Sequence, residues 1–159
     1  MKLKILIEPN AVLRQKAEKI DPKDISGKKI QRIIKDMVET LENAESGAGL
    51  AAPQIGISLR LCVLAKNYSS DKKNPTVLVN PEIKPSSLLK KWDYEGCLSV
   101  PNICGQVKRW KKIKIEALNE KGEILKFRAS DFLARLIQHE VDHLDGILFI
   151  DKAKNIKKE

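Results

Sequence analysis

Cysteine is scarce in this chain of 159 residues, which carries only Cys62, Cys97 and Cys104. A secreted protein held together by disulfides has a denser and usually even-numbered set. The sparse, odd count argues against a disulfide scaffold. It favours reduced thiols in a cytosol.

Long apolar runs are also missing. The first residues, MKLKILIEPNAV, hold only a short apolar stretch before Glu8 and Pro9. That stretch lacks the length and the small-residue cleavage site of a signal peptide, and it lacks the arginine-rich bias of a transit peptide. No run elsewhere approaches the length that spans a bilayer. We therefore expect a cytoplasmic protein with no membrane contact.

Negative charge is in deficit. Thirty Lys and Arg residues face 21 Asp and Glu residues, which leaves a net charge of +9, and aromatic residues make up only 4%. Such a surplus favours polyanions, such as nucleic acid, as long-range partners. An ordinary solvated basic surface gives the same total. The charge therefore suggests a class of partner and leaves the chemistry open.

The length fits one domain, residues 1–159. Within KKIQRIIKDMVETLENAESG the apolar residues recur at helical spacing until Gly47, which predicts an amphipathic helix. SDFLARLIQHEVDHL predicts a second helix with Ser130 or Asp131 as its N-terminal cap, and Gly146 ends it.

The segments between these helices have the period of β-strands. LRLCVLA, PTVLVNPEI, KKIKIEAL and ILKFRA predict strands, and the last two form a hairpin around NEKGE. They are too closely spaced for crossover helices. The order predicts an α+β fold with mainly antiparallel sheets packed around the C-terminal helix. Residues 151–159 are predicted to be a basic tail.

Both histidines of the chain lie in one helical turn. QHEVDH sets His139 and His143 four residues apart, with Glu140 directly after the first. Imidazoles at that spacing lie on one helix face and can converge on a metal ion, with the glutamate beside it as a candidate base. The alternatives are two ordinary hydrogen-bonded helix histidines, or a structural metal site, which normally closes with four protein ligands.

A catalytic metal site uses three protein ligands and keeps one position open for water. The third ligand must therefore come from another residue type. Asp145, Asp151 and Glu159 follow the second helix, but none is convincing by position. A thiolate is the other option.

The three cysteines differ in their surroundings. Cys62 lies inside the apolar strand LRLCVLA, where a small buried hydrophobe is expected. Cys97 lies in YEGCLSVPN, where Gly96 and Pro101 indicate irregular backbone that can present a sulfur. Cys104 stays open on chemical grounds. Spacing favours Cys97 only weakly.

Three separated stretches resemble the signature of the peptide deformylase family. They are GAGLAAPQIG (Gly47 to Gly56), EGCLS (Glu95 to Ser99) and QHEVDHLDG (Gln138 to Gly146). Each is a weak signal alone, but the three in this order are specific. The resemblance implies the deformylase α+β fold and removal of the formyl group from N-formylmethionyl nascent chains. One departure is Asp131, where the family commonly has glycine.

The resemblance also implies a metal site and a mechanism. One divalent metal ion per chain is held by Cys97, His139 and His143; Fe²⁺ is the metal that the resemblance implies, and Zn²⁺ suits the same ligands. Water activated by the metal attacks the formyl carbon, with Glu140 as general acid and base. The side-chain amide of Gln54 and the backbone N–H of Leu98 stabilise the formyl oxygen.

Further residues bind the substrate in this hypothesis. Ala48, Gly49 and Gly96 pair with the extended peptide, while Phe132 and Leu136 line the methionine pocket. Gly47 and Gly49 are expected to allow positive φ and a close backbone approach. Finally, Glu95 accepts the remaining N–H of a ligand histidine.

Two other functions fit parts of the pattern. The first is a metallopeptidase with the same HExxH turn and a downstream carboxylate ligand. The second is a basic RNA- or ribosome-binding module whose metal is structural. KRWKKIK (108–114) is expected to be a solvated strand face, with electrostatic contact to the ribosome as the functional alternative. A monomer is expected.

Overall fold

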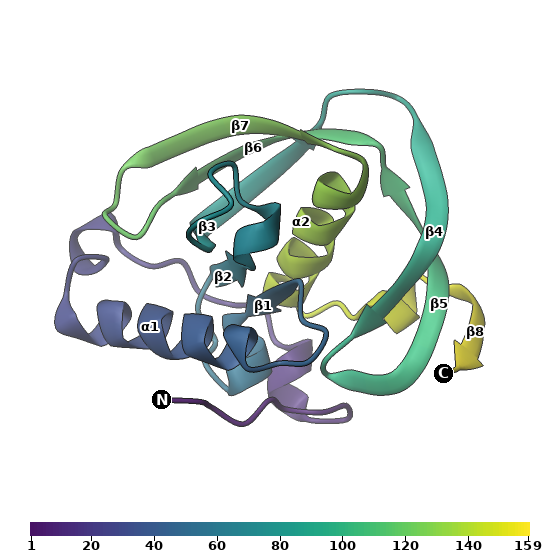
Figure 1. Cartoon of the computed structure of the whole chain (residues 1–159), viewed down its shortest axis with the longest axis horizontal. Helices are drawn as coiled ribbons and strands as arrows, with labels where there is room; N and C mark the ends of the chain where they lie inside the picture. The colour runs from purple at the N-terminus through teal and green to yellow at the C-terminus, as the bar shows by residue number, and fades with distance from the viewer.

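The computed structural model describes residues 1–159 and has two antiparallel sheets with a helix between them (Figure 1). Both sheets contact this helix, α2 (Asp131–Leu144). The other α-helix, α1 (Lys28–Glu42), packs against the first sheet at β1 and β2. The α+β class predicted from the sequence is confirmed.

The larger sheet has the strand order β1-β2-β3-β6-β7, and each neighbouring pair is antiparallel. Its strands are β1 (Gly49–Ala51), β2 (Leu61–Leu64), β3 (Thr76–Pro85), β6 (Lys112–Leu118) and β7 (Ile124–Ser130). The predicted hairpin is the β6–β7 pair. Because side chains alternate across a strand, β6 buries its apolar set on one face while its lysines face solvent.

The smaller sheet has the order β4-β5-β8 and lies on the side of α2 opposite the larger sheet (Figure 1). It comprises β4 (Lys90–Cys97), β5 (Val100–Trp110) and β8 (Lys154–Lys158). This sheet was not predicted from the sequence. The segment predicted as a tail, 151–159, supplies β8, which pairs with β5.

Short 3-10 helices connect these elements. They span Ala11–Arg14, Pro22–Asp24, Ala52–Ile55, Lys66–Tyr68 and Phe149–Asp151. No helix is long and apolar enough to cross a membrane.

Helix α1 has the predicted apolar face but ends at Glu42, earlier than the predicted end at Gly47. Ile30, Ile34, Met37 and Leu41 recur on one face and are buried. They pack on residues of the larger sheet such as Leu50 in a shared apolar cluster. The charged residues between them lie mostly in solvent, so burial of one stripe holds this helix against the sheet.

Helix α2 is buried on nearly all sides, because sheets cover it from two directions. Its start differs from the prediction. Ser130 holds the N-cap position, but its side chain makes no capping hydrogen bond. Asp131 has φ +53°, in the left-handed region that favours glycine. The helix ends as predicted, with Gly146 at φ +73° directly after the C-cap residue Asp145.

Candidate metal centre

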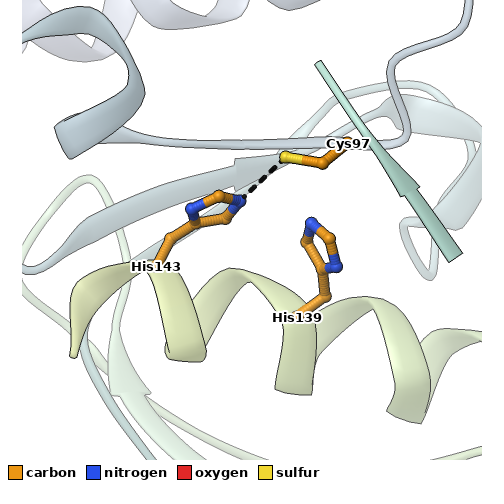
Figure 2. A group of neighbouring side chains, drawn as sticks. All are labelled: Cys97, His139 and His143. Carbon is orange, nitrogen blue, oxygen red and sulfur yellow. Dashed lines mark hydrogen bonds between the residues drawn. The ribbon is translucent and has the colours of Figure 1, made fainter. Parts of the chain in front are cut away.

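Three side chains converge at the junction of the two sheets. His139 and His143 lie one turn apart on α2, and Cys97 is the last residue of β4 (Figure 2). Their ligand atoms all lie within 4.8 Å of one another. The Cys97 Sγ and the His143 Nε2 are 3.3 Å apart. The fold therefore brings together residues that are more than 40 positions apart in the sequence.

The donor set suits a divalent ion. Sulfur and nitrogen ligands at about 2.3 and 2.1 Å from a tetrahedral ion lie roughly 3.6 Å from each other, close to the spacing seen here. No fourth residue joins the group. Three ligands leave one position for water or substrate, as catalytic sites require. The carboxylate ligand that a metallopeptidase of this type needs is absent from the group.

The backbone around Cys97 is more regular than predicted. Gly96 and Pro101 lie within β4 and β5, which form a tight hairpin whose turn is Leu98 and Ser99. The irregularity is a shift of register after Glu95, where the pairing moves on to Cys97 and Val100. This shift places the sulfur at the end of the strand, above α2.

Glu95 orients one of the imidazoles. Its Oε1 lies 2.8 Å from Nδ1 of His139, so the other ring nitrogen points toward Cys97 and His143 (Figure 2). Burial opposes the charged form of His139, but hydrogen bonds to Cys97 and Glu95 raise the pKa of His139 to about 10. A metal ion must therefore displace a proton from this imidazole.

His143 has the opposite electrostatics. Burial and the neighbouring His139 lower the pKa of His143, which keeps its imidazole neutral. Its Nε2 faces the sulfur, while its Nδ1 is buried without a hydrogen-bond partner. The neutral imidazole is the form that binds a metal ion.

Two arginines hold Glu95 in place. Arg109 donates to both carboxylate oxygens at 2.9 Å, and Arg135 adds a third bond at 2.7 Å. Burial alone would raise the pKa of Glu95, but hydrogen bonds from His139 and Arg109 lower it well below its usual value. Glu95 is therefore ionised, and the paired arginines compensate its buried charge.

The role of Arg109 was not predicted from the sequence. It lies in KRWKKIK, which was expected to be a solvated face, but only 4% of Arg109 is exposed. Besides Glu95 it binds Asp142, which also accepts a hydrogen bond from Lys152 at 3.0 Å. Strand β5 alternates, so the neighbouring Lys108 faces outward while Arg109 points toward α2.

Glu140 is buried beside the metal ligands. Its Oε1 lies against the backbone of β1, where a Cβ added to Gly49 would stand 2.6 Å away. Its Oε2 has no hydrogen-bond partner. Burial raises the pKa of Glu140 to about 7, although the nearby His139 opposes this. A carboxyl group with such a pKa can both accept and donate a proton near neutrality.

Gly47 and Gly49 of GAGLAAPQ are required because there is no room for a Cβ, and not because the backbone adopts unusual angles. Neither Gly47 nor Gly49 has a positive φ, contrary to the expectation from the sequence. A Cβ at Gly47 would meet the Leu41 side chain at 2.7 Å. In the structure both glycines leave room for neighbouring side chains, and the close approach of this backbone to a peptide stays a prediction.

Gln54 presents its amide to the cluster. It lies in the 3-10 helix Ala52–Ile55, and its Oε1 accepts a hydrogen bond from the Ala51 N–H at 2.9 Å. This bond turns Nε2 toward Ser99 Oγ, at 3.1 Å, and Cys97 Sγ, at 3.6 Å. The orientation of the amide is therefore fixed by β1.

A cavity of about 510 Å³ opens onto these residues. Cys97, His139, Glu140 and Gln54 form part of its lining. The other residues singled out in the sequence also line it: Ala48, Gly49, Glu95, Gly96, Leu98, Phe132 and Leu136. Leu136 is buried and Phe132 is half-exposed, so the apolar part reaches from the helix to the surface.

Comparisons with known proteins agree with this arrangement. The family model described as polypeptide deformylase matches residues 2–159. Peptide deformylase 2 of Clostridium acetobutylicum is 44% identical over 147 residues, which cover 92% of each chain. The chain belongs to the polypeptide deformylase family.

Solved structures give the same result. A peptide deformylase from Legionella pneumophila has a TM-score of 0.86 and 40% identity, over 98% of this chain and 88% of that one. A class I type b peptide deformylase from Acinetobacter baumannii, solved with Met-Ala-Ser bound, has a TM-score of 0.87 and 33% identity, over 96% and 98%. The family consists of metal-dependent hydrolases that remove the N-formyl group from nascent peptides, and this chain is an enzyme of that family.

Proposed function

We propose that this chain hydrolyses the formamide of N-formylmethionyl nascent polypeptides and releases formate, with Cys97, His139 and His143 as the metal ligands. The observation that carries the proposal is the convergence of one sulfur and two ring nitrogens beside the buried Glu140, at the wall of a cavity. The whole chain, 1–159, acts as a single catalytic domain, because the site draws on residues from Gln54 to His143.

Fe²⁺ is the metal proposed for this site, and Zn²⁺ suits the same three ligands. A divalent ion held there supplies Lewis-acid chemistry, in which water is acidified and the formyl carbonyl is polarised. The thiolate of Cys97 donates more charge than a third imidazole would. Glu95 supports the set by fixing the ring of His139.

Glu140 moves the proton in the proposed reaction. Its Oε2 is free of hydrogen bonds, and its pKa of about 7 suits an acid–base catalyst at neutral pH. It accepts a proton from the attacking water and delivers it to the departing amine. The formyl carbon–nitrogen bond breaks, leaving formate and a free α-amine.

Gln54 and Leu98 stabilise the negative charge that develops on the formyl oxygen. The Nε2 of Gln54 already points at the cluster, and the bond from Ala51 to its Oε1 fixes that direction. Leu98 follows Cys97 in the hairpin turn, so its backbone N–H is the second proposed donor. Donors that are fixed before the reaction need no reorganisation when charge develops.

The cavity is proposed to take the start of the peptide. Phe132 and Leu136 form the apolar wall for the methionine side chain, and the backbone of Ala48, Gly49 and Gly96 pairs with the extended chain. The related structure solved with Met-Ala-Ser supports a peptide ligand of this kind.

We also propose that the chain is a cytoplasmic monomer in electrostatic contact with the ribosome, and the net charge supports the contact. The charge of +9 attracts polyanions over long range. Nascent peptides emerge from a particle rich in RNA, so this attraction would raise the rate of encounter with the substrate.

Formate release tests the proposed function. Protein purified without oxygen is incubated with formyl-Met-Ala-Ser, and formate is measured before and after a chelator is added. We expect turnover that the chelator abolishes and that Fe²⁺ restores. The absence of formate from metal-loaded protein would refute the proposal.

A further inference from the structure

The outer face of the β4-β5-β8 sheet exposes two aromatic rings. Trp92 and Tyr94 are 39% and 45% exposed. They lie two residues apart in β4 and therefore share a face. Helix α2 covers the opposite face of this sheet (Figure 1). No element of the chain covers the outer face, so the rings are available to a partner.

Lysines surround both rings. Lys108 is the cross-strand partner of Trp92, and its Nζ lies 5.9 Å from the ring centroid. Lys154 of β8 approaches the same ring at 5.2 Å, and Lys157 lies 4.4 Å from the ring of Tyr94. These three lysines and two rings, from all three strands, form one patch, which we call the lysine–aromatic face.

The part of the face around Trp92 carries no carboxylate. Asp93 and Glu95 alternate with the aromatic residues, so their side chains belong to the other side of β4, where Glu95 is buried. Glu159 lies near Cys104, the cross-strand partner of Lys157, and lines the same cavity as Tyr94, so it is the one carboxylate close to the Tyr94 end of the face. Positive charge and exposed π-surface therefore coincide around Trp92, where Lys108 and Lys154 have no carboxylate partner.

We propose that the lysine–aromatic face binds single-stranded RNA. Bases stack on the exposed rings, and the lysine ammonium groups contact the phosphates. An acidic peptide or a phospholipid headgroup would use the lysines and leave the rings without a partner. Single-stranded RNA uses both parts of the face. This inference goes beyond deformylation and does not involve the metal ligands.

Binding of a fluorescein-labelled oligouridylate of about 12 nucleotides to the full chain tests the proposal by anisotropy. Three phosphate contacts predict that log K falls with log salt with a slope of about −2. Trp92→Ala is expected to weaken binding at least fivefold, because stacking on one ring contributes about 1–3 kcal/mol per base. Trp92→Phe is expected to retain most of the affinity.

Two double variants that remove the same charge distinguish RNA binding at the lysine–aromatic face from long-range attraction by the net charge of the chain. Lys108→Gln with Lys154→Gln should reduce the slope by about 1.4. Lys28→Gln with Lys29→Gln removes the same charge from the exposed start of α1 and should leave the slope almost unchanged. Equal effects of the two pairs would overturn the proposed location.

Competitors identify the partner class. We expect oligouridylate to compete better than inorganic polyphosphate or vesicles of anionic phospholipid. The proposal is wrong if Trp92→Ala binds RNA like the unmodified chain, or if polyphosphate or the vesicles compete equally well. Formate release by the same variants is expected to stay unchanged. A failure of deformylation would not alter the RNA result, so the two proposals fail separately.

Discussion

The carboxylate of Glu140 on α2 packs directly against the backbone of Gly49 on β1, leaving no room for a Cβ: that atom would stand 2.6 Å from Oε1. Gly49 therefore sets the position of the proposed acid–base group. Gly49→Ala is expected to displace the carboxylate and to lower kcat about 100-fold, the cost of a misplacement of about 1 Å. The metal content should stay at the level of the unmodified protein.

Formate assays and metal analysis check this prediction together. Loss of metal along with activity would show that the alanine disturbs the ligands and not Glu140 alone. An alanine variant with normal kcat would contradict the role given to the contact.

Removal of the carboxylate itself should have a larger effect. Glu140→Ala is expected to retain the metal and to lose turnover by about 10²- to 10⁴-fold, the usual contribution of a positioned general acid–base. Glu116→Ala is the control, since the Glu116 side chain is 65% exposed on β6. Full activity of Glu140→Ala would exclude the proposed proton transfer.

Arg109 should matter for stability as well as for the site. Arg109→Ala leaves Glu95 and Asp142 without their shared buried cation. The loss of one partner from a buried ion pair costs about 3–5 kcal/mol in the free energy of unfolding. Urea denaturation measures this change. Lys108→Ala, one residue away and exposed, should change stability by less than about 0.5 kcal/mol.

Equal destabilisation by Arg109→Ala and Lys108→Ala would mean that the ion pairs do not stabilise the fold. We also expect Arg109→Ala to bind metal more weakly, because Glu95 orients His139. Metal content after dialysis against a chelator of graded strength reports this second effect.

The end of α2 allows a test with a matched control. Gly146 and Gly122 both have positive φ, +73° and +79°. A Cβ at Gly146 would lie 2.5 Å from the backbone oxygen of Arg14, whereas at Gly122 the nearest atom is 3.7 Å away. Gly122→Ala should cost about 1–2 kcal/mol, the left-handed penalty alone. Gly146→Ala should cost more, because the clash adds to that penalty. Equal melting temperatures of the two variants would contradict this explanation.

Much of the fold could be predicted from hydrophobic period. Helix α1 and the β6–β7 hairpin each have one apolar face and one polar face, so their pattern shows both the element and its orientation. The smaller sheet has no such pattern. β4 and β8 are mostly charged or polar, and β8 is an edge strand whose lysines face solvent. β4 pairs with β5 across a two-residue turn, but the partner that makes β8 a strand, also β5, is distant in the sequence.

The site was predictable in part for a similar reason. Two histidines one helical turn apart indicate a metal site from local sequence alone. The sulfur comes from another element, and it was the family resemblance that identified Cys97 as the ligand. Arg109 had no local signal, because the adjacent Lys108 and Arg109 place a basic residue on each face of the strand, which gives no indication of which face is buried. Its inward direction depends on Glu95 and Asp142, carboxylates that lie far away in the sequence.

The ligand set is tested most directly by X-ray absorption at the metal edge of protein purified without oxygen. Coordination by Cys97, His139 and His143 predicts one sulfur neighbour at about 2.3 Å and two imidazole nitrogens at about 2.1 Å, with oxygen in the remaining position. The sulfur neighbour should disappear in Cys97→Ser. A shell of nitrogen and oxygen without sulfur in the unmodified chain would contradict the proposed centre.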